Sequence, residues 1–418
     1  MTPGSAADAT PMLSCGPAAR VVPDAPPQSV GSGRLRVEVR RGAAEVAALA
    51  DAHGALFART PSAPIELSRP WLETYLASGR NSGRPVALTA WEGERLVGLL
   101  LLAVRSVLGV KVATPVGTGP PTSHLGLLVE PGAVAAPESL ADLCRAERPF
   151  DVLAMHDVAD DDAATQRWVT CLAASGLVVR RMPRTTCWRA VLGQSFDEFL
   201  VATKSAKSRR VLRNEDRKLR NAGVVRLESF HGADIDRSVL DRVAAVQAGS
   251  WMVRRGAPTL AQPFHRRLVL NLAGACSARA LIATLDGRDA ACSVVAEAHG
   301  RCSGLFMAFR LEHAPLSIGK WILIRTIEDA CTVGARTFDF GQGDAEYKRF
   351  WANDAHQIER VFVGRGVLGG LVARGLAAAW NLARQPKVRA AIRRARWLLW
   401  RARGGRPVGA PSTEESGS

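Results

Sequence analysis

The chain has 418 residues, 47% of them hydrophobic and 22% charged, so it can form two domains that each bury a core, and wholesale disorder is excluded. Its 55 Lys and Arg against 39 Asp and Glu give a net charge of +16, as in many proteins that bind nucleic acid or membrane surfaces. The excess is concentrated in residues 204–220 and 365–406. The remaining chain is about neutral, which argues against a nucleic-acid surface spread over the whole molecule.

The eight cysteines stand far apart, with no C-x-x-C pair and no His at ligand spacing. We therefore expect neither a zinc site nor a disulfide framework, no metal cofactor, and reduced thiols in a cytoplasmic protein. Residues 1–33 are rich in Pro, Gly, Ala and Ser and lack the regions of a signal peptide, so we expect a disordered lead.

Two mixed α/β units follow in the apolar pattern, over residues 34–192 and 224–365. In the first unit the pattern predicts helices over 43–58 and 69–78 and strands near 86–91, 96–105, 125–129, 150–155 and 186–192. In the second it predicts a helix over 318–333 and strands over 224–229, 280–285, 290–298, 301–309, 336–340 and 358–363.

The two units resemble each other internally. A strand, a Gly turn and an apolar strand surround Gly93, and the same order surrounds Gly287, 194 residues later. A Phe-Asp pair at Phe150 has a counterpart at Phe338, 188 residues later. A duplicated α/β unit explains both offsets, whereas the alternative is chance similarity of two hairpins.

Residues 193–223 link the units. Ser195 is a candidate N-cap with Glu198 three residues later, and Gly223 is a candidate stop, so the pattern predicts one long helix over 196–223. Its surface is basic over residues 204–220. This face is either solvated or binds an anionic part of a substrate.

The C-terminal segment, residues 366–418, combines apolar runs with many arginines and tryptophans. Its longest apolar run is interrupted by Arg374 and is too short and Gly-rich to indicate a transmembrane span. One interpretation is a basic amphipathic helix lying on the inner face of the membrane. The other is a helix packed on the body with solvated arginines, followed by a disordered end.

The densest group of unusual residues lies in 313–351. Ser317, Gly319 and Lys320 follow a strand and open a helix, an arrangement that can cradle phosphate through backbone N–H groups and the helix N-terminus. Tyr347 is one of only two tyrosines in the chain. A phenol with a pKa near 10 can protonate a departing thiolate, and a neighbouring carboxylate can accept the proton of an incoming amine or alcohol. The alternative is a tyrosine that only packs at a helix start.

These residues resemble a known family. The series Phe338-Asp339-Phe340-Gly341-x-Gly343-Asp344-x-x-Tyr347-Lys348-x-x-Trp351, after Pro315-x-Ser317-x-Gly319, is similar to the CelD/BcsL group of acetyltransferases in the GNAT superfamily. The basic helix before Gly223 is also similar to one in that group. The resemblance covers residues 35 to 364.

The resemblance implies an α/β fold of two tandem GNAT-like domains, as in the FemAB/FemX transferases, with mixed sheets flanked by helices. It implies acyl transfer from acetyl-CoA or another acyl-CoA to a small-molecule or sugar acceptor, in polysaccharide or cell-envelope assembly. Tyr347 would be the general acid and Asp344 or Glu346 the base. A backbone N–H in 304–309 would meet the oxyanion, and the first half would shape the acceptor cleft.

The resemblance also implies binding residues. Those for the donor would be Ser317, Ile318, Gly319 and Lys320. Those for substrate would be Asp339, Gln342, Lys348, Trp351, Arg209 and Arg213.

Two other classes of function stay open. One is a FemAB-like transferase whose donor is an aminoacyl-tRNA, with the basic helix following RNA phosphates. The other is a non-catalytic scaffold in polysaccharide biosynthesis.

Overall fold

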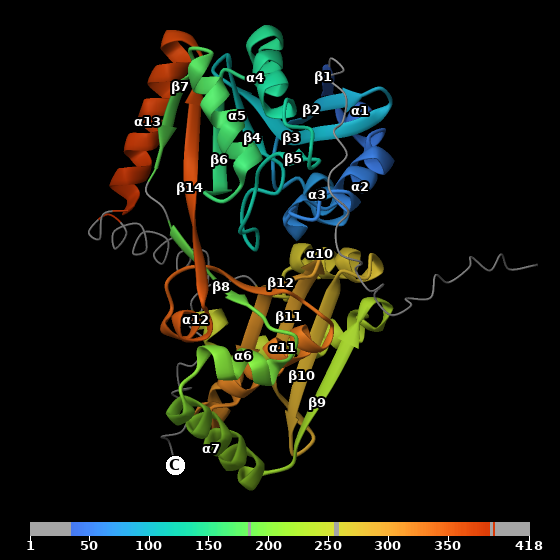
Figure 1. Cartoon of the computed structure of the whole chain (residues 1–418), viewed down its shortest axis with the longest axis vertical. Coiled ribbons are helices and arrows are strands. Elements are labelled where there is room, and N and C mark those ends of the chain that lie inside the picture. The colour runs from blue at the N-terminus through green and yellow to red at the C-terminus, as the bar shows by residue number, and fades with distance from the viewer. Residues whose placement is uncertain (1–34, 183–184, 255–258, 385–387, 389–418) are drawn as a thin grey trace, which may run out of the picture.

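The computed structural model describes residues 35–182, 185–254, 259–384 and 388. Its described strands form one continuous sheet that runs through two stacked halves, with helices on both faces (Figure 1). The order is β1-β2-β3-β4-β6-β14-β8-β13-β12-β11-β10-β9, with β5 paired to β3 and β7 paired to β14.

The N-terminal half contains the elements up to β8. These are β1 (Arg36–Arg41), α1 (Ala43–Ala47), α2 (Ala50–Ala58), η1 (Ile65–Leu67), α3 (Arg69–Ser78), β2 (Arg84–Glu92), β3 (Arg95–Val107), β4 (Val110–Pro115), β5 (Leu128–Val129), α4 (Ala136–Glu147), β6 (Val152–Ala159), α5 (Ala163–Ala174), β7 (Val178–Arg181) and β8 (Thr185–Val191). Two helices connect the halves, α6 (Phe196–Thr203) and α7 (Ala206–Ala222).

The C-terminal half repeats this pattern. Its elements are β9 (Val225–His231), η2 (Gly232–Asp234), α8 (Arg237–Ala248), α9 (Trp251–Arg254), α10 (Pro263–Gly274), β10 (Ala278–Leu285), β11 (Arg288–Ala298), β12 (Arg301–Phe309), η3 (Leu311–Leu316), α11 (Ile318–Thr332), β13 (Thr337–Gln342), α12 (Glu346–Trp351), β14 (Asp354–Gly364) and α13 (Gly366–Arg384).

The predicted duplication is confirmed by matching strand orders. β2, β3 and β4 are antiparallel neighbours and β4 pairs parallel with β6, while β10, β11 and β12 are antiparallel and β12 pairs parallel with β13. Gly93 and Gly287 both adopt positive φ in the corresponding hairpins, at 61° and 76°, a backbone conformation that glycine adopts without steric cost.

The halves exchange strands. β8, from the predicted first unit, pairs with β13 of the C-terminal half, and β14 pairs with β6 of the N-terminal half. The lower part of β14 also pairs with β8. Figure 1 shows β14 running from one half into the other, so the two predicted units share one sheet instead of forming separate sheets.

One large apolar core also spans the halves. It unites α2 and α3 with α8 and α10, and includes the buried side chains of Trp71 and Leu268. Asn271 Nδ2 on α10 donates to Thr74 Oγ1 on α3 at 2.8 Å, close to this contact. A smaller core under α6 and α11 contains Phe199, Phe338 and Trp351 and fixes the region where β12 and β13 diverge.

The structure corrects four predictions. Residues 196–223 form two helices, because Lys204 is extended and its ammonium donates to the backbone oxygen of Phe350 at 2.5 Å. Residues 43–58 also form two helices, and the predicted strand 125–129 is reduced to β5. Six described cysteines are free, but Cys276 is disulfide-bonded, so uniformly reduced thiols are not found; separations along a sequence do not reveal such pairing. The predicted lead and the disordered end of the tail lie outside the described residues.

Candidate active site

A cavity of about 1310 Å³ lies where the two halves meet, beside the diverging ends of β12 and β13. These strands pair only from Arg301 to Ser303 with Thr337 to Asp339. Beyond that point β12 contributes Gly304 through Met307 to the wall. The N-terminal half contributes residues 118–123, together with His156 and Asp157 from β6.

A β-bulge in β12 lies at this wall. Val294 of β11 is opposite Phe306, whereas Val295 is opposite Gly304, so Leu305 has no partner in the register. Leu305 lines the cavity. Bulges re-aim backbone groups and are common beside active sites, so the bulge falls inside the segment 304–309 in which the sequence analysis expected an oxyanion-binding N–H.

Tyr347 and Glu346 both line the cavity from the first turn of α12. Tyr347 remains 43% exposed, while the surrounding protein desolvates the phenol and raises its pKa. Asp344 does not line the cavity; its Oδ2 accepts from Arg349 Nη1 at 3.3 Å. The structure therefore brings together two of the three residues predicted for acid–base chemistry.

Lys348 and Trp351 hold α12 in place. Lys348 is buried, and its Nζ donates to the backbone oxygens of Gly341 at 3.0 Å and Gln342 at 2.7 Å, which ties α12 to the end of β13. Burial lowers the pKa of Lys348. Trp351 is 1% exposed and belongs to the core below the cavity. Both also border the cavity, so the substrate role predicted for them stays a prediction.

Strand β13 presents alternate residues to its two faces. Phe338, Phe340 and Gln342 line the large cavity, whereas Asp339 lines a second cavity of about 480 Å³. Asp339 Oδ1 accepts from the N–H of Gly341 at 2.6 Å. The predicted substrate role of Asp339 is therefore not supported at the large cavity, because the strand period of two turns its side chain to the other face.

Sequence reasoning gave no individual role to His156 or Asp157, although it expected the first half to shape a cleft. Asp157 Oδ1 accepts from Gln342 Nε2 at 2.6 Å, which joins the two halves at the cavity wall. Burial raises the pKa of Asp157 to about 6 and lowers that of His156 to about 4. The only sequence signal for a role at the cavity was that His156 and Asp157 are polar residues within an otherwise apolar strand. That signal points to the cavity only once the pairing of β6 with β14 is known.

The predicted phosphate loop opens α11. Ser317 is the N-cap residue, with positive φ of 55° and no side-chain capping hydrogen bond. Lys320 lines the cavity, and its Nζ is 2.7 Å from Glu215 Oε2 on α7. A Cβ on Gly319 would lie 2.3 Å from the ring of Phe309, so this glycine is needed for helix α11 to approach β12. Ile318 is fully buried in the core, so its side chain does not reach a ligand.

Helix α7 packs on α11 through its few acidic and apolar side chains. Besides the Glu215 ion pair, Asp216 Oδ1 accepts from Trp321 Nε1 at 2.7 Å. Arg209 Nη1 donates to the oxygen of Lys204 at 2.7 Å, and Arg213 is exposed. Neither arginine lines the large cavity, so the structure does not bring these two predicted binding residues to it.

A known protein family matches the part of the chain that carries Tyr347 and the elements around it. Residues 206–349 match a family described as "Acetyltransferase (GNAT) domain". This segment contains β12, α11, β13 and Tyr347. The C-terminal half therefore carries a GNAT acetyltransferase domain, which makes the protein an acyltransferase by class.

The whole architecture is similar to that of two solved structures. The crystal structure of FemX is similar with a TM-score of 0.56 and 13% identity, over 75% of this chain and 95% of that one. The C-terminal domain (DUF2156) of a "Putative Lysylphosphatidylglycerol Synthetase" from Agrobacterium fabrum is similar with a TM-score of 0.52 and 12% identity, over 80% of this chain and 96% of that one. At these identities the likeness concerns the fold. No curated protein matches the chain.

Proposed function

We propose that this protein is an acyl-CoA-dependent N- or O-acyltransferase in which the acceptor attacks the thioester directly in a ternary complex. The observation that carries the proposal is the position of Tyr347, which lies within the matched GNAT domain and lines the same cavity as the β12 bulge at Leu305. The cavity supports two substrates at once, since its volume of about 1310 Å³ exceeds the roughly 300–1,000 Å³ typical of a pocket for one small molecule.

The chemistry follows from the groups on that wall. The nitrogen or oxygen of the acceptor forms a bond to the thioester carbon, and a backbone N–H near Leu305 stabilises the developing oxyanion. The C–S bond then breaks, and Tyr347 gives its proton to the departing coenzyme A thiolate. Glu346 takes the proton that the acceptor loses, directly or through water. We assign the base to Glu346 in preference to Asp344, because only Glu346 lines the cavity.

The donor enters beside the N-terminus of α11. Backbone N–H groups after Ser317 and the helix dipole favour the pyrophosphate there, and Lys320 adds a positive charge at the cavity edge. Glu215 already pairs with this ammonium, so the phosphate competes with a carboxylate of α7. Gly319 contributes by letting α11 approach β12.

The acceptor binds at the end of the cavity formed by the N-terminal half. Asp157, His156 and Arg360 line that end and offer hydrogen-bonding groups for a polar molecule. The likeness to the CelD/BcsL series over Phe338–Trp351 supports a sugar or cell-envelope precursor as the acceptor class, within polysaccharide biosynthesis.

Calorimetry with acetyl-CoA and coenzyme A tests the donor class. We expect binding with a micromolar Kd, and release of free thiol when a mixture of amino sugars and sugar alcohols is added. A Lys320→Ala variant is expected to bind coenzyme A more weakly, whereas Lys207→Ala, on an exposed part of α7 outside the cavity, serves as the matched control. Absence of binding by the wild type at millimolar coenzyme would contradict the proposal.

A second candidate donor is an aminoacyl-tRNA, and the surface of α7 favours it. Lys207, Arg210, Arg213 and Arg217 are exposed along this helix, which packs directly on α11 at the cavity edge. If tRNA is the donor, binding weakens steeply with salt, and neutralising Arg210, Arg213 and Arg217 together reduces the salt slope. Unchanged tRNA binding in that triple variant, or none by the wild type at low salt, rejects this candidate.

We further propose peripheral contact with a membrane through the C-terminal segment. Residues 366–383 form one helix long and apolar enough to cross a bilayer by length and composition alone. Only 22% of that window is buried in the molecule, and Val367, Leu368 and Leu371 are exposed. Eleven bases without an acid in residues 365–406 complement an anionic surface. Sedimentation with anionic vesicles, compared with neutral ones, tests this contact.

A further inference from the structure

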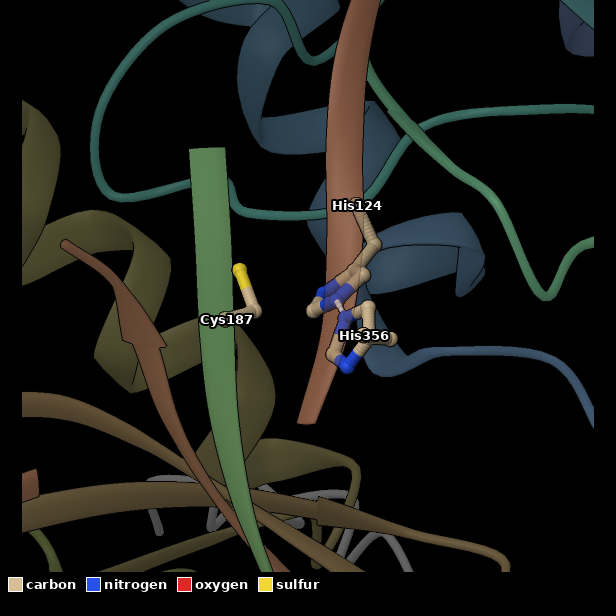
Figure 2. A group of neighbouring side chains, drawn as sticks. All are labelled: His124, Cys187 and His356. Carbon is tan, nitrogen blue, oxygen red and sulfur yellow. Dashed lines mark hydrogen bonds between the residues drawn. The ribbon is translucent and has the colours of Figure 1, made fainter. Parts of the chain in front are cut away.

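A cluster of metal-ligating side chains lies beside the smaller cavity, whereas Tyr347 lines the larger one. His124 comes from the segment between β4 and β5, Cys187 from β8 and His356 from β14. Their ligating atoms all lie within 4.8 Å of one another, and Figure 2 shows the thiol on the strand beside the two imidazoles. Successive members of the cluster are 63 and 169 positions apart in the sequence, so their spacing gives no sign of a metal site.

The sheet register brings two of these residues together. His356 on β14 is directly opposite Cys187 on the antiparallel strand β8, so both side chains stand on one face as a cross-strand pair. Both are buried, and His124 reaches the same point from the N-terminal half. The site is therefore assembled from the exchanged strands and from the segment that faces them.

The orientation of the rings suits a metal. Nε2 of His124 and Nε2 of His356 point at each other, 2.6 Å apart, with the rings stacked. Two nitrogens bound tetrahedrally to zinc at about 2.0–2.1 Å are about 3.3 Å apart, so the pair needs to open by less than 1 Å. The remaining nitrogen of His356, Nδ1, is buried with no hydrogen-bond partner among the described residues, so no hydrogen bond at that nitrogen opposes a small movement of the ring toward a metal.

Acidic groups surround the cluster. Glu66 is 2% exposed, and its Oε1 lies 3.5 Å from Nδ1 of His124, the nitrogen that faces away from His356. Carboxylates commonly orient metal-binding histidines in this way. Asp339 Oδ2 lies 3.7 Å from Nε2 of His124 but outside the group of ligating atoms that lie within 4.8 Å of one another, so it would have to move closer to serve as a fourth ligand. Two largely buried carboxylates beside a thiol and two imidazoles form a site that a divalent cation would neutralise.

We propose that His124, Cys187 and His356 bind a zinc ion, with Asp339 or water completing the coordination. The ion would stabilise the pairing of the exchanged strands β8 and β14 and their contact with the N-terminal half. Nitrogen and thiolate donors in a tetrahedral arrangement favour zinc over magnesium or calcium, which prefer oxygen ligands. The ion lies beside the smaller cavity and away from Tyr347, so its role is to stabilise the joined sheet. On binding, the Cys187 thiol releases its proton to solvent and forms a bond from sulfur to the metal.

The test uses the untagged full-length protein, stripped with a chelator and dialysed against Zn²⁺ or Co²⁺. We expect one metal per chain and a higher Tm on metal addition. The Co²⁺ protein should show a near-ultraviolet thiolate-to-cobalt charge-transfer band, together with the intense visible bands of tetrahedral cobalt. Zn²⁺ should displace the Co²⁺ and abolish these bands.

Variants separate the ligands from other buried groups. Cys187→Ser should lose the charge-transfer band, while Cys302→Ser, at another buried free thiol, should retain it. His356→Asn should abolish stoichiometric binding, and Glu66→Gln should weaken affinity by about 10- to 100-fold, as outer ligands do. If a ligand variant fails to fold, the spectrum of the wild-type Co²⁺ protein still decides. Absence of stoichiometric metal, or a Co²⁺ spectrum without thiolate character, overturns the proposal and leaves a hydrogen-bonded histidine pair.

Discussion

Gln342 donates from Nε2 to Oδ1 of Asp157 at 2.6 Å, so a residue at the end of β13 holds a buried carboxyl of β6 at the cavity wall. The two partners are 185 residues apart in the chain. The two strands belong to one sheet, in which β14 and β8 lie between β6 and β13, so this bond depends on the sheet that the halves share. It links the domain that carries Tyr347 to the surface on which we place the acceptor.

The raised pKa of Asp157 makes folding stability depend on pH. Its carboxyl binds a proton more tightly in the folded protein, where the pKa is about 6, than in the unfolded chain, where it is near 3.8. Folding stability therefore falls as pH rises through this window, by at most about 3 kcal/mol from this group. Asp157→Asn should remove that loss. Urea unfolding at pH 5 and pH 8 should show a smaller difference in the variant.

The exposed carboxylate of Asp344 provides the control for Asp157, because it lies at the surface in an ion pair with Arg349. Asp344→Asn should leave the difference in unfolding free energy between pH 5 and pH 8 as in the wild type. If Asp157→Asn also leaves it unchanged, burial of Asp157 does not affect its protonation.

The two tyrosines of the chain should respond differently to the same substitution. Tyr347→Phe should lower kcat by about 100-fold or more, the range expected for loss of a general acid, with little change in the free energy of unfolding. Tyr75 is fully buried and its hydroxyl donates to the oxygen of Gly119 at 2.6 Å. Tyr75→Phe should therefore cost roughly 0.5–1.5 kcal/mol of stability and preserve most of kcat. Steady-state kinetics and urea unfolding measure both; full activity in Tyr347→Phe would refute the acid assignment.

Lys348 should affect activity through the position of α12. Lys348→Met removes the hydrogen bonds to the oxygens of Gly341 and Gln342 and leaves these acceptors without that donor. We expect a loss of roughly 2 kcal/mol of stability and a lower kcat with KM for the donor little changed. Lys348→Arg keeps a donor and should recover part of both losses. A variant with normal stability and normal kcat would show that this lysine does not hold the helix.

Local patterns predicted most of this fold, and long-range contacts account for what they missed. The helix predicted over 318–333 matches α11, and the strand predicted over 301–309 matches β12, because apolar periodicity and flanking turn residues decide such elements. The break at Lys204 has a local cause, because Ser205 is the N-cap of α7 and its side-chain oxygen accepts from the N–H of Ser208. The hydrogen bond from Lys204 to the backbone of Phe350, 146 residues away, was not predictable from local patterns. The same holds for the strand exchange and for the meeting of His124, Cys187 and His356, which only the assembled sheet creates.

For the site, the sequence identified the segment better than the roles within it. Tyr347, Glu346 and Lys320 do line the cavity, as their place in the motif suggested. Asp339 faces the opposite side, and a one-residue step along a strand is enough to cause this. Motif resemblance locates a residue on the chain, whereas the face it occupies depends on pairing with strands from elsewhere.

Substitution of Gly319 tests whether this glycine is needed for the packing of α11 on β12 or for binding the donor's phosphate. A Cβ there would meet the Phe309 ring at 2.3 Å, so Gly319→Ala should destabilise the protein by about 1–3 kcal/mol, the usual cost of overpacking. Phe309→Leu alone should be mildly destabilising, but combined with Gly319→Ala it should recover stability, because the smaller side chain leaves room for the new methyl group. A double-mutant cycle in urea measures this coupling. The alternative outcome is that the effects of the two substitutions on the free energy of unfolding are additive and that only the affinity for coenzyme A falls. Gly319 would then be needed for binding the donor and not for the approach of α11 to β12.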